Sequence, residues 1–438
     1  MRLSLFVAAG AVAAISAAAL WSPVAPPVAS RAGTSTPQVA ARASIPTTDV
    51  DGPQPKGAGE TGSLHVETRQ GRPVIVREDG SIFRWIGASD FALFARFARG
   101  EDIRPILDQR IDLGFTILRV FTMFDRFGIG AAAGTGELNP AAVADYYTKL
   151  RAFIDLAAAR GIRLELVVLA DADGRPDGTG GLMSASAAQQ THLTRVLDVV
   201  QGTWNVTVEW SNEAFKNAQG VTGLTGECRA PRVLCAYGST LPDGPVPAGW
   251  PSLDYVTVHD HERSTEWPRT ARRYAELVDR LGKPVVADEP MGFAESARAD
   301  ARATEPSDAA YFAAAVAMSA SGATFHSDDG VASRQFSPVQ LEAAKAWAWA
   351  ARWVPPEAQT APSQEGGTCG TAGGGDMPIQ HCGLDTNASS RALSSLCRLV
   401  SPTEYCVRVR PVGPTVARPG WRITSEPRPG FVTLERAE

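Results

Sequence analysis

The chain has 438 residues, 42 of them basic and 47 acidic, which gives a formal net charge of -5. This length accommodates one large domain of roughly 250 to 300 residues and a smaller one. The balanced charge provides no basic surface for nucleic acid, so we expect no nucleic-acid partner.

The first 30 residues have the pattern of a secretory signal. Arg2 supplies a positive charge, and the run Leu3–Trp21 is almost without polar residues. Such segments are removed at export, and we predict a signal peptide over residues 1–30, cleaved near Ala19 or after Ser30. We therefore expect a secreted or periplasmic protein. An uncleaved membrane anchor is the alternative, because the run is just long enough to span a bilayer.

Residues 31–62 are rich in Pro, Ala, Ser, Thr and Gly, a composition typical of a flexible linker. A β-hairpin is expected next, from His65–Thr68 and Pro73–Val76, followed by a turn at Asp79-Gly80 and a strand-like run Ile82–Ile86.

Strands and helices then alternate. The expected strands are Phe83–Ala88, Thr116–Phe121, Arg163–Ala170, Val206–Ser211, Arg232–Tyr237, Tyr255–His259, Pro284–Asp288 and Ala323–His326. The expected helices are Ile103–Asp112, Ala141–Arg160, Ala187–Val200, Arg269–Leu281, Asp308–Ser319 and Pro338–Trp353. Eight strands with intervening helices predict an α/β fold, a (β/α)8 TIM barrel over residues 63–355. A doubly wound open sheet is the alternative, but no glycine-rich phosphate loop follows the first strand.

The remaining residues, 356–438, predict a small cysteine-containing β module or an extension of the barrel. Short strands are expected at Glu404–Arg410, Trp421–Thr424 and Gly430–Glu435. Nothing in this region indicates its function.

Six cysteines, an even number, fit a protein of an oxidising compartment. Cys228 and Cys235 lie close together in the sequence and predict a local disulfide bridge. The other four allow three pairings and lie in the C-terminal region: Cys369, Cys382, Cys397 and Cys406. A zinc site is the competing interpretation, but the chain lacks CxxC spacing, and export argues against such a site.

Two glutamates at strand ends are the candidate catalytic groups, because catalytic side chains of such barrels project from the carboxyl ends of strands. On the fourth strand, Val208 and Trp210 are expected to face the helices, and Glu209 to face the barrel interior with Glu213 above it. We interpret Glu209 as a buried scaffold carboxylate and Glu213 as an acid/base. Glu289, at the end of the seventh strand, is the candidate nucleophile.

Arg119 stands inside the otherwise apolar second strand. A buried arginine requires a partner, and a carboxylate at the barrel mouth would supply one. We therefore expect Arg119 to orient Glu289 and to keep it ionised.

These residues resemble clan A glycoside hydrolases, and glycoside hydrolase family 5 is the closest in style. The resemblance covers roughly residues 63–353 and rests on Glu209–Glu213 as Glu-x-x-Asn-Glu, with Arg119, His259 and Glu289 on the second, sixth and seventh strands. It implies that Glu213 is the acid/base and Glu289 the nucleophile of a retaining enzyme. It also implies further substrate-binding or supporting residues: Arg119, Asn212, which would contact the sugar 2-hydroxyl, His259 and His261.

The chain differs from the family pattern at three places. Ala214 follows the Asn-Glu pair where proline is usual, Asp171 ends the third strand where histidine is frequent, and His326 ends the eighth where a tryptophan is usual. We include His326 among the candidate supporting residues, together with Trp267 as a candidate sugar platform.

The sequence thus predicts a secreted glycoside hydrolase that cleaves β-glycosidic bonds of a polysaccharide or oligosaccharide by double displacement, with mannan or glucan favoured. We expect a carbohydrate substrate, no metal or organic cofactor, and a monomer. Two alternatives stay open. One is a catalytically inactive secreted glycan-binding barrel. The other is a metal-dependent hydrolase that uses His259 and His261, although the His-x-His of barrel amidohydrolases stands on the first strand.

Overall fold

The computed structural model describes the chain in several stretches. These are residues 62–125, 137–173, 180–213, 228, 232–238, 253–259, 267–289, 292–293, 309, 312–313, 316–317, 320–353, 395–400, 403–408, 421–428 and 431–436. For residues 267–272, 292–293, 339, 353 and all residues after 353, the description covers the backbone only. The predicted signal peptide and nearly all of the predicted linker lie outside these residues. Within them, no helix is long and apolar enough to span a membrane.

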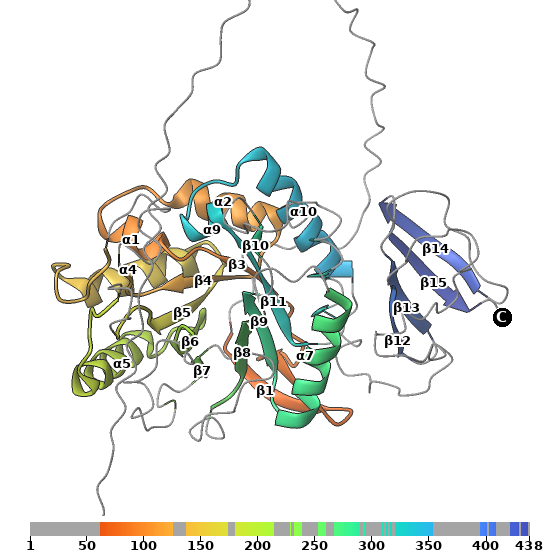
Figure 1. Ribbon diagram of the computed structural model, residues 1–438, viewed down its shortest axis with the longest axis horizontal. Coiled ribbons are helices and arrows are strands. Elements are labelled where there is room, and N and C mark those ends of the chain that lie inside the picture. The colour runs from red at the N-terminus through yellow and green to blue at the C-terminus, as the bar shows by residue number, and fades with distance from the viewer. Residues whose placement is uncertain are drawn as a thin grey trace, which may run out of the picture. The chain divides into compact units, whose positions relative to one another are not determined.

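Eight parallel strands form the core of the molecule (Figure 1). They are β3 (Trp85–Ser89), β4 (Ile117–Phe121), β5 (Arg163–Leu169), β6 (Val206–Ser211), β7 (Leu234–Gly238), β8 (Val256–His259), β9 (Val285–Glu289) and β11 (Gly322–Ser327). The hydrogen-bonded order is β7, β6, β5, β4, β3, β11, β9, β8. A parallel bridge between Ala236 and Tyr255 joins β7 to the chain just before β8 and closes the ring. The predicted (β/α)8 barrel is therefore confirmed.

Helices surround the strands (Figure 1). They are α1 (Leu93–Ala98), α2 (Arg104–Leu113), α4 (Tyr146–Ala159), α5 (Ser186–Val200), α7 (Trp267–Leu281), α9 (Asp328–Val331) and α10 (Pro338–Trp353). Their apolar side chains pack against the outward residues of the strands, so that Leu193 and Trp347 share one buried cluster with Val208 and Trp210. The short strand β10 (Gly292–Phe293) pairs with β11.

An N-terminal hairpin covers the amino ends of the barrel strands. It consists of β1 (Leu64–Arg69) and β2 (Arg72–Arg77), joined by Gln70 and Gly71, both at positive φ (50° and 82°). Positive φ at both loop residues is the geometry of tight two-residue hairpin turns. Apolar side chains of the hairpin form a second buried cluster with residues near the strand starts: Leu64, Ile75, Phe83, Trp85, Ile117, Leu234, Ala236, Tyr255 and Val286. The lower barrel interior therefore contains an apolar cluster.

One expected helix is shorter in the structure, and another is described only in part. The helix expected from Ala141 begins at Tyr146, because Asp145 before it has a left-handed backbone (φ 54°) that interrupts the helical path. Of the helix expected over 308–319, the described residues Ala309, Phe312, Ala313 and Val316 are helical and buried.

The C-terminal strands form two antiparallel hairpins. These are β12 (Ser395–Val400) with β13 (Thr403–Arg408), and β14 (Trp421–Arg428) with β15 (Phe431–Arg436). The sequence did not predict β12. Cys397 and Cys406 are register partners in the first hairpin. Cys369 and Cys382 lie outside the described residues, so the pairing of these four cysteines stays a prediction.

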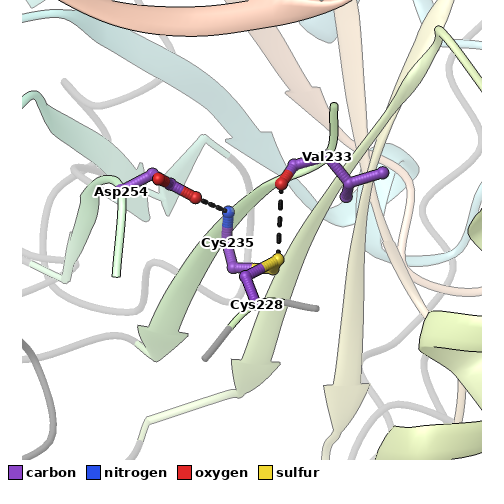
Figure 2. Close-up of a disulfide and its surroundings, with 4 residues drawn as sticks. All are labelled: Cys228, Val233, Cys235 and Asp254. Carbon is purple, nitrogen blue, oxygen red and sulfur yellow. Dashed lines mark hydrogen bonds between the residues drawn. A yellow bond between two sulfur atoms is a disulfide. The ribbon is translucent and has the colours of Figure 1, made fainter. Parts of the chain in front are cut away.

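The predicted local disulfide is present. Cys228 is bonded to Cys235 with a Cα–Cα distance of 5.8 Å. Figure 2 shows the bridge beside the Cys235 amide, which donates a hydrogen bond to Asp254 Oδ2 at 2.9 Å. The bridge therefore ties Cys228 to the buried strand β7.

Candidate active site

The candidate site lies at the carboxyl ends of the barrel strands. Arg119 is in the middle of β4, Glu209 is near the end of β6, and Asn212 and Glu213 directly follow β6. His259 and Glu289 are the last residues of β8 and β9. Since parallel strands end at the same edge of the barrel, four separate segments of the sequence meet here.

Arg119 is the centre of this cluster and is 1% exposed. Its Nε and Nη2 donate to the two carboxylate oxygens of Glu209 at 2.9 and 3.1 Å. Its Nη1 donates to Glu289 Oε1 at 2.5 Å, and Nη2 also donates to Asn212 Oδ1 at 2.9 Å. Burial alone would lower the pKa of Arg119, but the carboxylates around it raise the pKa well above its usual value. The guanidinium therefore stays charged and fixes side chains from two other strands.

The alternation expected on the fourth strand is present in the structure. Val208 and Trp210 belong to the cluster that packs against the helices. Glu209 is fully buried and forms a bidentate pair with Arg119. Glu213, two residues beyond the strand, has a left-handed backbone (φ 43°), and 13% of its side chain is exposed. Glu209 thus lies deep in the barrel, whereas Glu213 lies at the rim with access to solvent.

The imidazole of His259 lies between the two candidate catalytic glutamates. Its Nδ1 is 3.7 Å from Glu213 Oε1, and its Nε2 is 3.3 Å from Glu289 Oε1. Burial alone would lower the pKa of His259, but the negative charges of Asp288 and Glu289 raise the pKa well above its ordinary value. We therefore treat His259 as an imidazolium at neutral pH.

Two further buried carboxyl groups were missed in the sequence. Asp288 Oδ2 lies 3.2 Å from His259 Nε2 and 3.4 Å from Arg119 Nη2. Glu165, on β5, accepts a hydrogen bond from the Tyr255 hydroxyl at 2.9 Å. Burial first, and then the charge of Glu209, raise the pKa of Glu165 well above its usual range. Alternation along β5 would have revealed Glu165, because its neighbours Leu164 and Leu166 pack with the helices.

The remaining candidates lie at the periphery or outside the described residues. His326, at the end of β11, is half-buried; its Nδ1 lies 3.0 Å from Ser89 Oγ, and its ring packs against Phe91 at 5.4 Å. Trp267 begins α7, where only the backbone is described. His261 and Ala214 lie outside the described residues. Asp171 is buried, has a φ of 55°, and accepts a hydrogen bond from the backbone of Asp125.

The alternative of a metal-dependent hydrolase that uses His259 and His261 has no set of metal ligands among the residues described. Within them, no group of three His, Cys, Asp or Glu side chains is arranged to hold a metal ion. His259 contacts carboxylates through both ring nitrogens.

Comparison with known proteins gives likenesses in structure only. No protein-family model matches the chain, and no curated protein sequence matches it. The fold is similar to that of a glycoside hydrolase family 5 protein from Bacteroides vulgatus, at 16% identity and a TM-score of 0.45, covering 62% of this chain and 64% of that one. It is also similar to a family 5 mannosidase from Rhizomucor miehei (12% identity, TM-score 0.44, 68% and 99% covered). A third likeness is to an endo-β-1,4-mannanase from Thermotoga petrophila (14% identity, TM-score 0.43, 62% and 77% covered).

All three are glycoside hydrolases. Family 5, which the sequence resembles, is also the family named for two of these structures. The chain spans less than two thirds of the Bacteroides protein's length, at 64%. Identities of this size do not transfer an activity or a substrate to this chain.

Proposed function

We propose that this protein is a retaining glycoside hydrolase that cleaves β-glycosidic bonds of a polysaccharide or oligosaccharide. Glu289 acts as the nucleophile and Glu213 as the acid/base. One observation carries the proposal. Arg119 and His259 hold the Glu289 carboxylate at 2.5 and 3.3 Å, and the same imidazole contacts Glu213 at 3.7 Å on its other nitrogen.

The first step is attack by Glu289 on the anomeric carbon. A carboxylate attacks as a nucleophile in its ionised form, and Glu289 contacts both Arg119 and His259. Glu213 donates its proton to the leaving oxygen, so the glycosidic C–O bond breaks as the glycosyl–enzyme ester forms. In the second step Glu213 takes a proton from water, which attacks the ester and releases Glu289.

The position of Glu213 fits this exchange of protons with solvent. Its side chain is 13% exposed, whereas that of Glu289 is 6% exposed. Asn212, fixed by Arg119, lies beside Glu213 in the sequence and is the group we assign to the sugar 2-hydroxyl.

The test is reducing-end release from a panel of β-linked mannans and glucans. Glu213→Gln and Glu289→Gln should each lower kcat by at least 100-fold, and Glu342→Gln, a change on the exposed surface of α10, should not. The anomer formed first, followed by NMR, should retain the configuration of the substrate. Inversion would refute the double displacement.

The main alternative is a glycan-binding barrel without catalysis. It would be supported if the parent protein binds a polysaccharide of the panel without cleaving it, and if both glutamine variants bind equally well. Undiminished cleavage by both glutamine variants would refute the roles of the two glutamates.

We also propose export, on the basis of the N-terminal signal pattern, and a monomeric state. Expression of the full chain in a bacterial host, with fractionation and N-terminal sequencing, should recover a shortened protein in the periplasm or medium. A full-length chain in the membrane fraction would instead support an uncleaved anchor. Light scattering of the purified protein tests the monomer.

A further inference from the structure

Asp288 is the extra residue of a β-bulge at the candidate site. Strands β8 and β9 pair Val258 with Ala287 and then His259 with Glu289, so β9 contains one more residue than β8 at this point. Such an insertion bends the strand and redirects the side chains that follow, and bulges are over-represented next to active sites.

The bulge explains how two consecutive carboxylates reach one guanidinium. Val286 belongs to the buried cluster inside the barrel, beneath the N-terminal hairpin, and Ala287 belongs to the cluster that packs against the helices. Regular alternation would therefore direct Asp288 inward and Glu289 outward. Instead, Asp288 and Glu289 lie 3.4 and 2.5 Å from nitrogens of Arg119.

Asp288 contacts groups that also hold Glu289. Its Oδ2 lies 3.2 Å from His259 Nε2 and 3.4 Å from Arg119 Nη2. Its Oδ1 accepts a hydrogen bond from the Glu289 amide at 2.9 Å. The side chain is wholly buried, at 0% exposure. Asp288 is therefore placed to act through its neighbours and not by touching a substrate.

The ionisable groups around Asp288 come from five strands. They are Arg119 on β4, Glu165 on β5, Glu209 at the end of β6 with Glu213 beyond it, His259 on β8 and Glu289 on β9. In the resting state of the proposed mechanism, Glu289 is ionised and Glu213 carries a proton. With Glu165 also neutral, the two cations then face the three carboxylates of Glu209, Asp288 and Glu289. The buried cluster thus has one excess negative charge.

We propose that Asp288 is a positioning residue that holds His259 as an imidazolium against Glu289 and supplies this excess charge. The proposal rests on the proposed function and deepens it. When Glu289 becomes a glycosyl ester, it loses its negative charge. The carboxylates of Glu209 and Asp288 then balance the positive charges of Arg119 and His259. The excess negative charge also favours the positive charge that develops on the sugar ring in the transition state.

The test compares Asp288→Asn with a matched control, Asp90→Asn. Asp90 is also fully buried and paired with an arginine, but that arginine is Arg110 of α2. The imidazole of His259, assigned through His259→Gln, is titrated by NMR in each protein. The pH profile, kcat and KM are measured on a cleaved glycan.

Asp288→Asn should lower the pH at which His259 loses its proton by roughly one to three units. The basic limb of the pH–rate profile should move to lower pH, and kcat should fall at least tenfold with KM changed less than threefold. In Asp288→Glu, which keeps the negative charge, His259 should lose its proton at about the same pH as in the parent. Asp90→Asn should leave both the titration and the profile where they are.

An unchanged His259 titration in folded Asp288→Asn would overturn the proposal, as would an equal shift in Asp90→Asn. If Asp288→Asn does not fold, Asp288→Ser removes the same charge with a smaller side chain and has the same expected result. A parent that cleaves no glycan refutes the proposed function, while the NMR titration still tests the role of Asp288.

Discussion

Replacing Arg119 by methionine tests how strongly the site depends on a single cation. Methionine is similar in length but carries no charge, so Glu209, Asp288 and Glu289 would lose the guanidinium they share. Removing one partner of a buried ion pair typically costs about 3 to 5 kcal/mol. The loss of stability also follows from the free energy of protonating one of the carboxylates that Arg119 no longer neutralises.

The least costly response to the loss of Arg119 is that one carboxylate takes up a proton. For a glutamate with an ordinary pKa of about 4.3, protonation at pH 7 costs about 1.36 kcal/mol for each of 2.7 pH units, or about 3.7 kcal/mol. The same step costs about 1 kcal/mol at pH 5. Arg119→Met should therefore lose about 4 kcal/mol of unfolding free energy at pH 7 and much less at pH 5.

The assay is urea unfolding of both proteins at pH 7 and pH 5, with the slope against urea checked for two-state behaviour. Arg110→Met is the matched control, because Arg110 is equally buried and bonded to both oxygens of Asp90, at 3.0 Å each. Both variants should lose stability, but only Arg119→Met should lose glycan cleavage per folded molecule, by at least 100-fold. A loss for Arg119→Met below about 1 kcal/mol at pH 7, or one independent of pH, would refute the reasoning.

Three further changes test the buried ionisable groups and the disulfide. Burial raises the pKa of Glu165 well above its usual range, so the contribution of Glu165 to stability is lost as pH rises above about 4.3. The stability of Glu165→Gln relative to the parent should therefore increase between pH 4 and pH 8. A stability difference that stays constant over this range would contradict this. Burial lowers the pKa of His192 to about 4, whereas the unfolded chain takes up this proton below about pH 6.5, so stability falls by about 3 kcal/mol as pH drops between these values. His192→Gln should remove most of that loss in urea unfolding at pH 7 and pH 4.5, and a loss equal to the parent's would show that other groups cause it. Opening the Cys228–Cys235 bridge should lower the free energy of unfolding by about 2 kcal/mol. Cys228→Ala alone should lower it as much as the double alanine variant does, since either change opens the bridge.

The barrel could be predicted from the sequence because its signals are local. Runs of β-branched residues separated by helical patterns depend only on neighbours in the chain, and the strand expected over Val206–Ser211 has these same bounds in the structure. The same holds for the inward direction of Glu209, which follows from alternation along one strand. The disulfide between Cys228 and Cys235 was also predictable, because the two residues are separated by only 7 positions.

The missed features depend on contacts between strands that are far apart in the sequence. The bulge at Asp288 is a property of the register between β8 and β9, and no pattern within β9 reveals it. The sequence suggested Glu289 as the partner of Arg119, whereas in the structure Arg119 bonds both Glu289 and Glu209, which lie 170 and 90 residues away in the chain. The bounds of the helix that begins at Tyr146 depend on the backbone of one residue, Asp145.

The two layers of the barrel interior differ in what they contribute. The lower layer contains an apolar cluster that the N-terminal hairpin covers, and burial of this cluster stabilises the fold. The upper layer places Arg119 and His259 among the carboxyl groups of β5, β6 and β9. Buried ion clusters can often be replaced by apolar residues without loss of stability, so stability does not account for this layer. The proposed reaction, which needs one ionised carboxylate, one proton donor and a net negative site, would account for it.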